Sequence, residues 1–496
     1  MTKTSNAVVI GANDNVAVAL EDIKSGDIVI NVTATVPIPA GHKIAIKPIA
    51  QGENIIKYDH PIGRATAPIK PGEHVHTHNV KTNLSGILEY LYNPNLPSKS
   101  APAAQANFQG YVRKNGQVGI RNEIWIINTV GCVNKIAEKI ALEATRRHTG
   151  RVDGIYTFVH PYGCSQLGDD HTYTQNILKN LANHPNAAGV LVLGLGCENN
   201  HIEEFKQVLG QWDDSRLKFL NTQDVSDDIA AGLSIIDELV AYAETFKREP
   251  VPISKLVIGL KCGGSDGFSG ITANPLVGRL SDTIIEHGGA CLLTEVPEMF
   301  GAETLLMNRC TNETVFTKSV SLINDFKEYF IRHNQEIYEN PSPGNKEGGI
   351  TTLEEKSLGC TQKGGQSVVV DVLNYGETVT KPGLVLLQGP GNDIVAVTNL
   401  TAAGAHIVLF TTGRGTPLGG PVPTVKISSN TALATNKPHW IDFDAGVLLN
   451  SDSIGIEALT EAFFDYIKRL ASGEVLAKNE VNNYREISIF KDGVTL

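Results

Sequence analysis

The sequence predicts a multidomain α/β protein, in which a small β domain precedes two α/β units with largely parallel sheets. Three observations support this fold class. The chain has 496 residues, about three times the ~150 residues of a typical domain. Short alternating runs fill its first part, and a Pro- and Ala-rich stretch follows them. Beyond that stretch, apolar strand-like runs alternate with helical segments, which is typical of crossover-connected parallel strands.

Residues 1–95 are predicted to form the small β domain. The runs DIVINVTATV and HKIAIKPIA alternate apolar and polar residues, and the turn-like segments GENIIKYDHPIG and IKPGEH separate such runs. The stretch NPNLPSKSAPAAQA that follows is rich in Pro, Ala and Ser and poor in core residues. We therefore expect a linker at residues 96–109.

Residues 110–250 are predicted to form a middle α/β domain. The strand-like runs EIWIINTV, GIYTFVH and GVLVLGLG each precede a segment with helical spacing. We expect these helices at about residues 133–148, 172–182 and 202–209. This order of strands and helices favours a largely parallel sheet.

Residues 251–496 are predicted to form a C-terminal α/β domain. Its strand-like runs are KLVIGL, ACLLTEV, SVVVDVL, GLVLLQGP and AHIVLFTTG. A last helix is expected to start near Ser453 and to stop before Gly473. Within it, apolar residues keep helical spacing at Ile456, Leu459, Phe463, Ile467 and Leu470.

Composition and charge narrow the classes of function. The net charge of −11 argues against sequence-independent nucleic-acid binding, which needs a basic face. No apolar run is long enough to span a bilayer, and the start MTKTSNAVVIGANDN lacks a basic-then-apolar leader, so we expect a cytoplasmic protein. Seven cysteines, an odd number, favour reduced thiols in a metal or active site over a disulfide framework.

The segment KCGGSDGFSGITANP, residues 261–275, is the first candidate site because it follows the strand-like run KLVIGL. Ligands bind at the carboxyl edge of parallel sheets, and glycines let backbone N–H groups approach an anion. The segment also contains Cys262 and Asp266. The alternative is a glycine-rich turn with a buried thiol.

Four cysteines lie just past the ends of predicted strands: Cys132, Cys164, Cys197 and Cys262. Strand ends are where a doubly wound fold builds its site, so these thiols could bind a soft or borderline metal, including an iron–sulfur cluster. Alternatively they are small hydrophobic residues buried where strands end. The sequence contains no CxxC pair, so a zinc ribbon is not supported.

Histidines and carboxylates add further candidates. The segment GEHVHTHN places His74, His76 and His78 at alternate positions, so in a strand all three would face a metal or an anionic substrate. A solvent-facing strand without a ligand is the alternative. Glu295 lies at the end of the strand-like run ACLLTEV and Glu298 just after it. Carboxylates there suit a divalent cation or a general base, unless they form a solvated acidic turn.

Two glycine-rich segments complete the candidates. Residues 340–365 are long and low in apolar residues, which favours an active-site loop over a linker. In TTGRGTPLGGP, Arg414 stands between glycines, where a guanidinium could clamp a carboxylate or simply occupy a surface turn. The segment lacks the full dinucleotide fingerprint, and the chain has no GKS or GKT, so phosphate-loop chemistry is not supported.

Long blocks of the sequence resemble a known family. They are GYVRKNGQVGIRNEIWIINTVGCVN, HPYGCSQLGDDH, LGLGCENN, KCGGSDGFSGITANP, TEVPEMFGAE, NPSPGNKEGGITTLEEKSLGCTQK and TTGRGTPLGG. Together they are similar to the sugar-acid dehydratases of the altronate and galactarate dehydratase family. The GEHVHTHN segment resembles the β-clip (SAF-type) domain at the front of that family, and the match extends to the final GVTL.

The resemblance implies a β-clip, SAF-like domain at residues 1–95, a middle domain that serves homodimerisation, and a Rossmann-like C-terminal domain. It implies a hydro-lyase of hexuronate catabolism that converts D-altronate to 2-dehydro-3-deoxy-D-gluconate and water. The HVHTHN block and Cys360 favour an aldonic over an aldaric substrate. Galactarate or another sugar acid is the alternative substrate, and a non-catalytic sugar-acid binding module is the alternative function.

Ferrous iron is the cofactor that the resemblance implies, with another divalent cation or an iron–sulfur cluster as alternatives. The reaction needs a base for the C2 proton, stabilisation of an enediolate, and an acid for the C3 hydroxyl. A divalent metal supplies the second role as a Lewis acid. The expected metal ligands are Asp266, Glu295 and Glu298 with Cys262 nearby; the expected substrate contacts are Arg121, Asn340 and Arg414; His76 or His160 is expected to act as base or acid.

Overall fold

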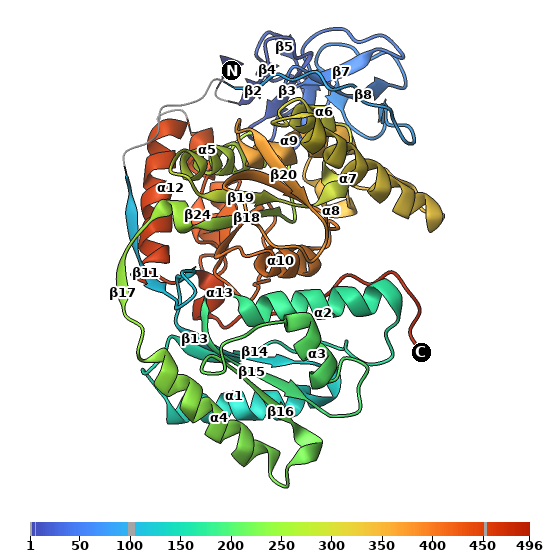
Figure 1. The fold of residues 1–496 in the computed structure, drawn as a ribbon. Helices are drawn as coiled ribbons and strands as arrows, with labels where there is room; N and C mark the ends of the chain where they lie inside the picture. The colour runs from blue at the N-terminus through green and yellow to red at the C-terminus, as the bar shows by residue number, and fades with distance from the viewer. Residues whose placement is uncertain (1, 5, 98–104, 451–453) are drawn as a thin grey trace.

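The structure, a computed structural model, describes residues 2–4, 6–97, 105–450 and 454–496. It consists of three units stacked along one direction (Figure 1). The N-terminal β unit lies at the top, the C-terminal unit in the centre, and the unit from the middle of the sequence at the bottom. The C-terminal unit therefore contacts both of the others.

The N-terminal unit contains only short strands, which pair antiparallel. One sheet has the order β1-β2-β3-β6-β9, a second β10-β8-β7, and a third consists of β4 and β5. Their bounds are β1 Thr2–Lys3, β2 Ala7–Val9, β3 Val16–Ala19, β4 Ile28–Val29, β5 Val32–Thr33, β6 Lys43–Ala45, β7 Asn54–Lys57, β8 His60–Ala65, β9 His74–Val75 and β10 Val80–Lys81. The prediction of a small β domain is confirmed.

The middle unit is a four-stranded parallel sheet with the order β14-β13-β15-β16. Every residue of β15 is buried, because helices cover both faces of such a sheet. The bounds are β13 Glu123–Asn128, α1 Asn134–Arg147, β14 Gly154–Thr157, α2 Gly168–Asn183, β15 Ala187–Gly194, α3 Ile202–Leu209, β16 Leu217–Asn221 and α4 Asp228–Ala243. Helix α3 has the predicted bounds, whereas α2 begins one turn earlier than predicted.

An antiparallel stem joins this unit to the rest of the chain. Strand β11 (Asn107–Val112) pairs with β17 (Arg248–Pro252) and with β12 (Val118–Gly119). The chain thus enters and leaves the unit side by side (Figure 1). Strand β11 starts inside the predicted linker, and β17 crosses the predicted boundary at residue 250; residues 98–104 of that linker lie outside the described residues.

The C-terminal unit is built on a seven-stranded sheet with the order β20-β21-β19-β18-β22-β23-β24, in which every pair is parallel. The strands are β18 Val257–Cys262, β19 Ala290–Leu293, β20 Val369–Leu373, β21 Gly383–Leu387, β22 Ile407–Thr412, β23 Thr424–Ser428 and β24 Phe443–Asp444. After β18, the strands β19, β20 and β21 are all added on one side of β18. The next strand, β22, pairs with the other side of β18. This reversal is the topological switch point, where doubly wound sheets bind ligands.

Helices cover both faces of this sheet (Figure 1). They are α5 Ala273–Glu286, α6 Glu303–Met307, α7 Glu313–Arg332, α8 Pro343–Glu347, α9 Leu353–Cys360, α10 Asp393–Ala402, α11 Thr431–Asn436, α12 Ile456–Ala471 and α13 Lys478–Val481. The predicted start of α12 near Ser453 lies outside the described residues, and Gly473 follows the helix with φ 76°. No helix among the described residues has the length and apolar character that crossing a membrane requires.

The segment 340–365 is mostly helical, so the prediction of a loop is wrong. It contains α8, α9 and a short 3₁₀ helix, η5 (Thr361–Gly364). Every residue of α9 is buried, between β8 of the N-terminal unit and the central unit. Polar residues are tolerated there because they are paired, as Glu355 is with Lys43 and Lys57.

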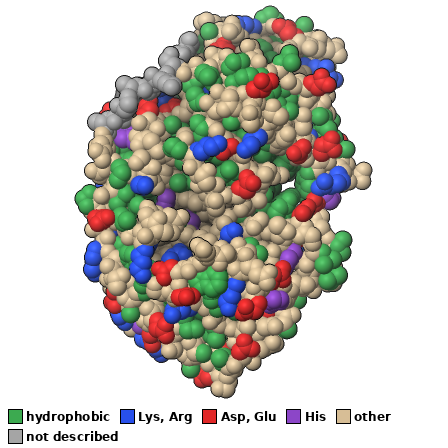
Figure 2. Space-filling model, viewed as in Figure 1, with side chains coloured by type: hydrophobic (Ala, Val, Ile, Leu, Met, Phe, Trp, Pro, Cys, Tyr) green, Lys and Arg blue, Asp and Glu red, His purple; other side chains and the backbone are tan. Residues whose placement is uncertain are grey.

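The surface drawn in Figure 2 intersperses basic and acidic side chains. Nucleic-acid binding needs a continuous basic stripe, which this face does not offer.

Candidate active site

The switch point of the C-terminal sheet brings together side chains from two neighbouring strands. Cys262 is the last residue of β18, and Glu295 and Glu298 follow β19 directly. Glu295 has a left-handed backbone (φ 68°), which starts the 3₁₀ turn η4 (Val296–Glu298) and folds both carboxylates back toward β18. The backbone N–H of Cys262 donates to Glu295 Oε2 at 3.0 Å.

Two thiols and one carboxylate meet in a buried triangle formed by Cys262, Glu298 and Cys360. The Sγ atoms of Cys262 and Cys360 each lie 3.1 Å from Glu298 Oε2 and 3.3 Å from each other. All three donor atoms fall within 4.8 Å of one another. Cys360 reaches this point from the last turn of α9. Thiolate and carboxylate ligands in one cluster suit a borderline divalent metal.

Three buried lysines surround the carboxylates. Lys356 Nζ lies 2.9 Å from Glu298 Oε1, Lys363 Nζ lies 3.3 Å from Glu295 Oε2, and Lys261 forms an ion pair with Glu295. Lys261 also contacts Asp393 at 2.9 Å. The two carboxylates and two thiols are four potential anions facing three ammonium groups. Ionised thiols would leave an excess of negative charge that a divalent cation could balance.

The charges set the protonation of these groups. Burial opposes ionisation of Glu298, but Lys356 and the other lysines hold the pKa of its carboxyl well below the ordinary value. Burial and the neighbouring Glu298 raise the pKa of Glu295. The hydrogen bond with Cys262, together with burial, raises the pKa of the Cys360 thiol. A cation bound in the triangle would therefore displace thiol protons.

Asp266 is not a member of the triangle. Its Oδ1 accepts hydrogen bonds from the hydroxyls of Ser269 (2.9 Å) and Ser429 (2.8 Å), and its Oδ2 accepts from Asn430 (3.1 Å). These bonds tie the segment after β18 to the segment after β23. The carboxylate is thus occupied by the protein, which argues against the predicted metal-ligand role of Asp266.

The glycines of the 261–275 segment serve contacts between protein segments. A Cβ on Gly267 would stand 2.0 Å from the carbonyl oxygen of Gly41, and one on Gly270 would stand 2.3 Å from Tyr58 Oη. The N–H of Gly267 donates to the carbonyl of Gly348 at 2.7 Å. We expected these glycines to admit an anion, whereas they admit the N-terminal unit and α8.

A cluster of four histidines faces this region from the N-terminal unit. Strand β9 ends at Val75, so the three histidines do not share one strand; a turn that Asn79 closes follows. The rings of His74, His76 and His78 nevertheless lie together with that of His42, with centroids 4.8 to 5.6 Å apart.

Burial lowers the pKa of three of these imidazoles, those of His42, His74 and His76. It lowers the pKa of His74 to about 3 and that of His76 to about 4. The ring of His42 donates through Nε2 to the carbonyl of Glu347 at 3.0 Å, and His76 Nδ1 lies 3.1 Å from Thr351 Oγ1. The histidine cluster therefore borders the segment that carries α8.

The same segment reaches the triangle. Lys356 Nζ, which contacts Glu298, also donates to Asn340 Oδ1 at 3.1 Å. Arg414 forms an ion pair with Glu347 at 3.2 Å, and both side chains are exposed. The predicted residues Asn340 and Arg414 thus lie around the candidate site. Their partners, Lys356 and Glu347, could form other contacts when a ligand binds.

Arg121 and His160 lie elsewhere. Both are buried. The guanidinium of Arg121 forms an ion pair with Glu480 and donates to two backbone carbonyls. His160 donates through Nε2 to the carbonyl of Asn128 at 2.9 Å, and its Nδ1 accepts from the N–H of Tyr162. These satisfied partners argue against the predicted substrate contact of Arg121 and the predicted catalytic role of His160.

Sequence reasoning missed the three lysines and did not place Cys360 among the ligands. Lys261 ends the apolar run KLVIGLK, and Lys356 and Lys363 flank Cys360 in EEKSLGCTQK. Buried lysines are rare unless paired, so their positions suggested an exposed surface. One sequence signal of a buried lysine was available, because Lys261 lies at the end of an apolar, strand-like run.

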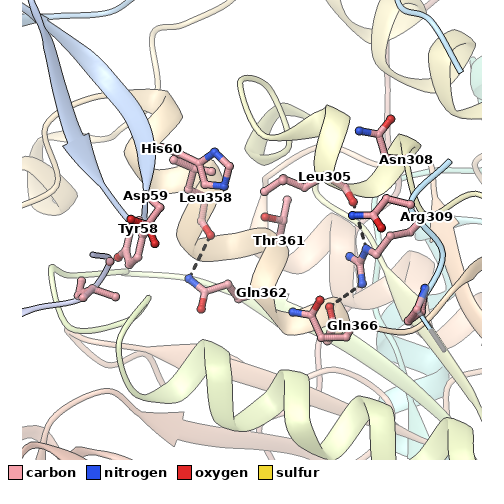
Figure 3. Close-up of a pocket in the computed structure, with 15 residues that line it drawn as sticks. Tyr58, Asp59, His60, Leu305, Asn308, Arg309, Leu358, Thr361, Gln362 and Gln366 are labelled. Atoms are coloured by element: carbon pink, nitrogen blue, oxygen red, sulfur yellow. Dashed lines mark hydrogen bonds between the residues drawn. The ribbon is translucent and has the colours of Figure 1, made fainter. Parts of the chain in front are cut away.

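Little free space adjoins the triangle. A void of 10 Å³ lies beside Asp266, Lys356 and Cys360. A larger cavity of 560 Å³ opens between the N-terminal and central units. In Figure 3, Tyr58 and His60 stand on one side of this cavity, and Arg309 stands on the other. Its volume suits a small organic ligand.

Comparisons with known families cover nearly the whole chain. Residues 5–83 match the altronate/galactarate dehydratase SAF domain, residues 110–244 the second domain of D-galactarate dehydratase/altronate hydrolase, and residues 253–495 the C-terminal domain of D-galactarate/altronate dehydratase. The first match agrees with the expected β-clip unit.

Individual relatives extend this finding. The chain is 54% identical to altronate dehydratase of Bacillus subtilis (strain 168) and 55% identical to altronate dehydratase of Escherichia coli (strain K12), in each case over 98% of this chain and 99% of the relative. It is 32% identical to galactarate dehydratase (L-threo-forming) of Escherichia coli (strain K12), over 95% of this chain and 94% of that protein.

Proposed function

The chain belongs to the altronate and galactarate dehydratase family, and from this premise we propose that it removes water from D-altronate to give 2-dehydro-3-deoxy-D-gluconate. One observation carries the choice of substrate. Over nearly its full length the chain is far more similar to two altronate dehydratases than to a galactarate dehydratase. The protein is thus a hydro-lyase of hexuronate catabolism, and galactarate is the less favoured substrate.

Ferrous iron is the cofactor that fits the triangle best. Cys262, Glu298 and Cys360 offer two sulfur donors and one oxygen donor within 4.8 Å of one another, and ferrous iron accepts both kinds. Three protein ligands leave positions for substrate oxygens. When bound, the ion would act as a Lewis acid on the carboxylate and hydroxyl oxygens of the substrate.

The remaining roles fall to groups around the triangle. The ammonium groups of Lys261, Lys356 and Lys363 supply fixed positive charge, which stabilises the negative charge that develops on the substrate carboxylate. His76 is neutral because burial lowers its pKa to about 4, so it can accept a proton from C2. Arg414 has an exposed guanidinium that suits the substrate carboxylate.

Substrate binding requires movement, because a void of 10 Å³ cannot hold a hexonate. The segment 340–351, which includes α8, contacts the histidine cluster, Arg414 and Lys356. We propose that it shifts when substrate enters. The exposed ion pair between Arg414 and Glu347 then breaks, which frees Arg414 for the substrate carboxylate.

We also propose that the enzyme works in the cytoplasm as a homodimer. All seven cysteines are free thiols in the structure, and thiols persist in a reducing compartment. The family resemblance assigns dimerisation to the middle unit, where Leu142 of α1 is an exposed apolar side chain. Sedimentation of the purified protein tests the dimer.

Turnover is the test of the proposed function. The protein is incubated with D-altronate and ferrous iron under anaerobic, reducing conditions, and the 2-keto-3-deoxy acid is measured; galactarate is tested in parallel. We expect rapid product formation from altronate and at least about tenfold slower turnover of galactarate. Binding of altronate without product, or a preference for galactarate, would reject the proposal.

The ligand assignment has its own test. The Glu298→Gln variant should lose iron and activity, whereas Glu461→Gln, an exposed residue on α12, should retain both. An active, iron-loaded Glu298→Gln variant would reject the triangle as the metal site while leaving the proposed reaction intact.

A further inference from the structure

The middle unit presents three exposed, free cysteines at one edge of its parallel sheet: Cys132, Cys164 and Cys197. They follow β13, β14 and β15, which are adjacent in the order β14-β13-β15. Since parallel strands end at the same edge, the three loops lie next to one another. Each loop repeats one motif, a Gly-Cys pair followed two residues later by Asn or Gln, as GCVN, GCSQ and GCEN.

Backbone hydrogen bonds join the three loops beside the cysteines. The N–H of Gly131 donates to the carbonyl of Tyr162 at 2.9 Å, and the N–H of Asn200 donates to the carbonyl of Gly163 at 3.0 Å. The Asn200 side chain donates to the carbonyl of Thr129 at 3.1 Å. Gly131, Gly163 and Asn200, which lie within three residues of the cysteines, thus fix the positions of the three loops relative to one another.

The glycine before each cysteine has a structural cause. A Cβ on Gly131 would stand 2.6 Å from the carbonyl oxygen of His160, and one on Gly163 would stand 1.9 Å from that of Thr129. Gly196 has φ 126°, a conformation that other residues rarely adopt. The glycines at 131 and 163 therefore let the backbones of the first two loops come close together beside Cys132 and Cys164.

Buried polar atoms without partners gather in the same region. Asn128 Oδ1, Gln166 Nε2, Asn200 Oδ1 and Thr222 Oγ1 have no hydrogen-bond partner, and all four residues are at least nine-tenths buried. Buried polar groups are nearly always paired, so Gln166 Nε2 and Thr222 Oγ1, which can donate, indicate a missing acceptor. The amide oxygens of Asn128 and Asn200 only accept, and a sulfide would not satisfy them. An amide N–H such as that of Gln166 can donate to the sulfide of a cluster.

We propose that Cys132, Cys164 and Cys197 bind an iron–sulfur cluster. Within the described residues, only the Cys262, Glu298 and Cys360 triangle gathers three donor atoms within 4.8 Å, so these three thiols lie too far apart for a single ion as arranged. A polynuclear cluster spaces its thiolate ligands more widely. The spacing of the thiols thus favours iron and sulfide over a single zinc ion. The nearby Glu198 carboxylate is already bound by the Thr129 hydroxyl and by the N–H groups of Leu195 and Gly196.

This site is separate from the triangle. Its ligands come from the middle unit, whereas Cys262 and Cys360 belong to the C-terminal unit. Three thiolates on a cluster of about four irons leave one iron without a protein ligand. Binding the cluster displaces the three thiol protons.

The test uses the full chain, purified without oxygen and reconstituted with ferrous iron and sulfide. Iron, acid-labile sulfide, visible absorbance and electron paramagnetic resonance are measured. We expect a brown protein with about four sulfide ions per chain. Cys132→Ser, Cys164→Ser and Cys197→Ser should each lower sulfide at least tenfold, with unchanged circular dichroism. Cys262→Ser and the buried control Cys310→Ser should keep their sulfide.

Alkylation followed by mass spectrometry gives a readout that does not depend on the variants folding. The reconstituted wild type should protect Cys132, Cys164 and Cys197 from iodoacetamide, and chelation of iron should expose all three. Three results would overturn the proposal: no sulfide in the reconstituted wild type, sulfide retained when all three cysteines are serine, or sulfide lost only with Cys262→Ser.

Discussion

Glu298 Oε2 accepts a hydrogen bond from each of two thiols at 3.1 Å, so one carboxylate oxygen organises the candidate metal site. Neighbouring Glu295 takes a different part, because Lys261 and Lys363 occupy its oxygens. The two glutamates, three residues apart, thus have different roles. One faces the thiols, and the other anchors positive charge beside them.

Replacing Cys360 with serine should weaken iron binding at the triangle by at least about 100-fold. Loss of groups that merely support a ligand costs about 10- to 100-fold in metal affinity, so loss of a ligand should cost no less. The measurement is competition with a chelator, with altronate turnover in parallel. Cys310→Ser, which removes another buried thiol, is the control and should behave as wild type. Equal iron affinity in the two variants would contradict the assignment.

Lys363 offers a test of the charge around the site. Its ammonium is buried and has Glu295 as its salt-bridge partner. Removing a group that stabilises developing charge costs about 10²- to 10³-fold in kcat. We expect Lys363→Met to lose kcat in that range with little change in KM or in iron content. A kcat within about threefold of wild type would show that Lys363 is only structural.

The sequence located part of this site for a definite reason. Cys262, Glu295 and Glu298 follow strand ends, where a parallel sheet presents its ligands. Cys360 comes from a helix 98 positions further along than Cys262, and no local pattern connects the two. The burial of Lys356 and Lys363 could not be predicted, because a charged side chain in a sequence gives no sign of a partner contributed by another segment. Only Lys261 gave a signal, since it ends an apolar strand-like run.

At the scale of elements, α9 attaches the N-terminal unit to the sheet. Glu355 of α9 lies 2.8 Å from both Lys43 of β6 and Lys57 of β7, and all three side chains are buried. Burial opposes its ionisation, but the two ammonium groups lower the pKa of Glu355 to about 2. The carboxylate therefore stays charged throughout the working range.

Glu355→Gln should destabilise the protein by about 3–5 kcal/mol, because it leaves two buried ammonium groups without a counter-charge. Urea unfolding at neutral pH measures the loss. The exposed ion pair of Glu138 with Lys135 provides the control, and Glu138→Gln should change the free energy of unfolding by less than about 1 kcal/mol. Similar small losses in both variants would contradict the role of Glu355 as an interdomain anchor.

Elements with strong periodicity were predictable, and elements that depend on other units were not. Helix α3 keeps the predicted bounds because its own apolar spacing determines it. The polar sequence of α9 predicts a loop, but the segment is helical because its charged side chains find buried partners in other segments. Strand β9 stops at Val75 because Asn79 closes a turn that the alternating histidines did not reveal.

At the scale of the whole molecule, the C-terminal unit lies between the other two (Figure 1), an arrangement that chain order did not suggest. One hydrophobic cluster crosses from the middle to the C-terminal unit, for example from Trp125 and Phe205 to Leu400 and Phe410. The last residues run back to the middle unit, where Thr495 bridges to Gln166. The two α/β units therefore share a core and should unfold together.

Two buried histidines make this shared interface sensitive to acid. His184 of the middle unit donates to the carbonyl of Ala405 at 3.1 Å, and His406 of the C-terminal unit donates to that of Val118 at 2.8 Å. Their second ring nitrogens accept from the N–H groups of Asn186 and Val257. Each ring is thus held neutral, and burial lowers the pKa of His184 to about 3 and of His406 to about 4.

We expect stability to fall as the pH drops below about 6.5, the pKa of an unfolded histidine. Between that pH and about 4, the two histidines bind protons in the unfolded chain but stay neutral in the folded chain. The free energy of unfolding therefore decreases as the pH falls. At pH 5 each histidine should cost about 2 kcal/mol relative to pH 7. Urea unfolding at the two pH values measures this difference.

His406→Gln should reduce this pH-dependent difference by about 2 kcal/mol, since glutamine does not titrate, although the variant is less stable at pH 7. The exposed His439→Gln should leave it unchanged. An unchanged difference in His406→Gln would mean that acid acts on other groups, and that the interface between the α/β units does not depend on a neutral imidazole.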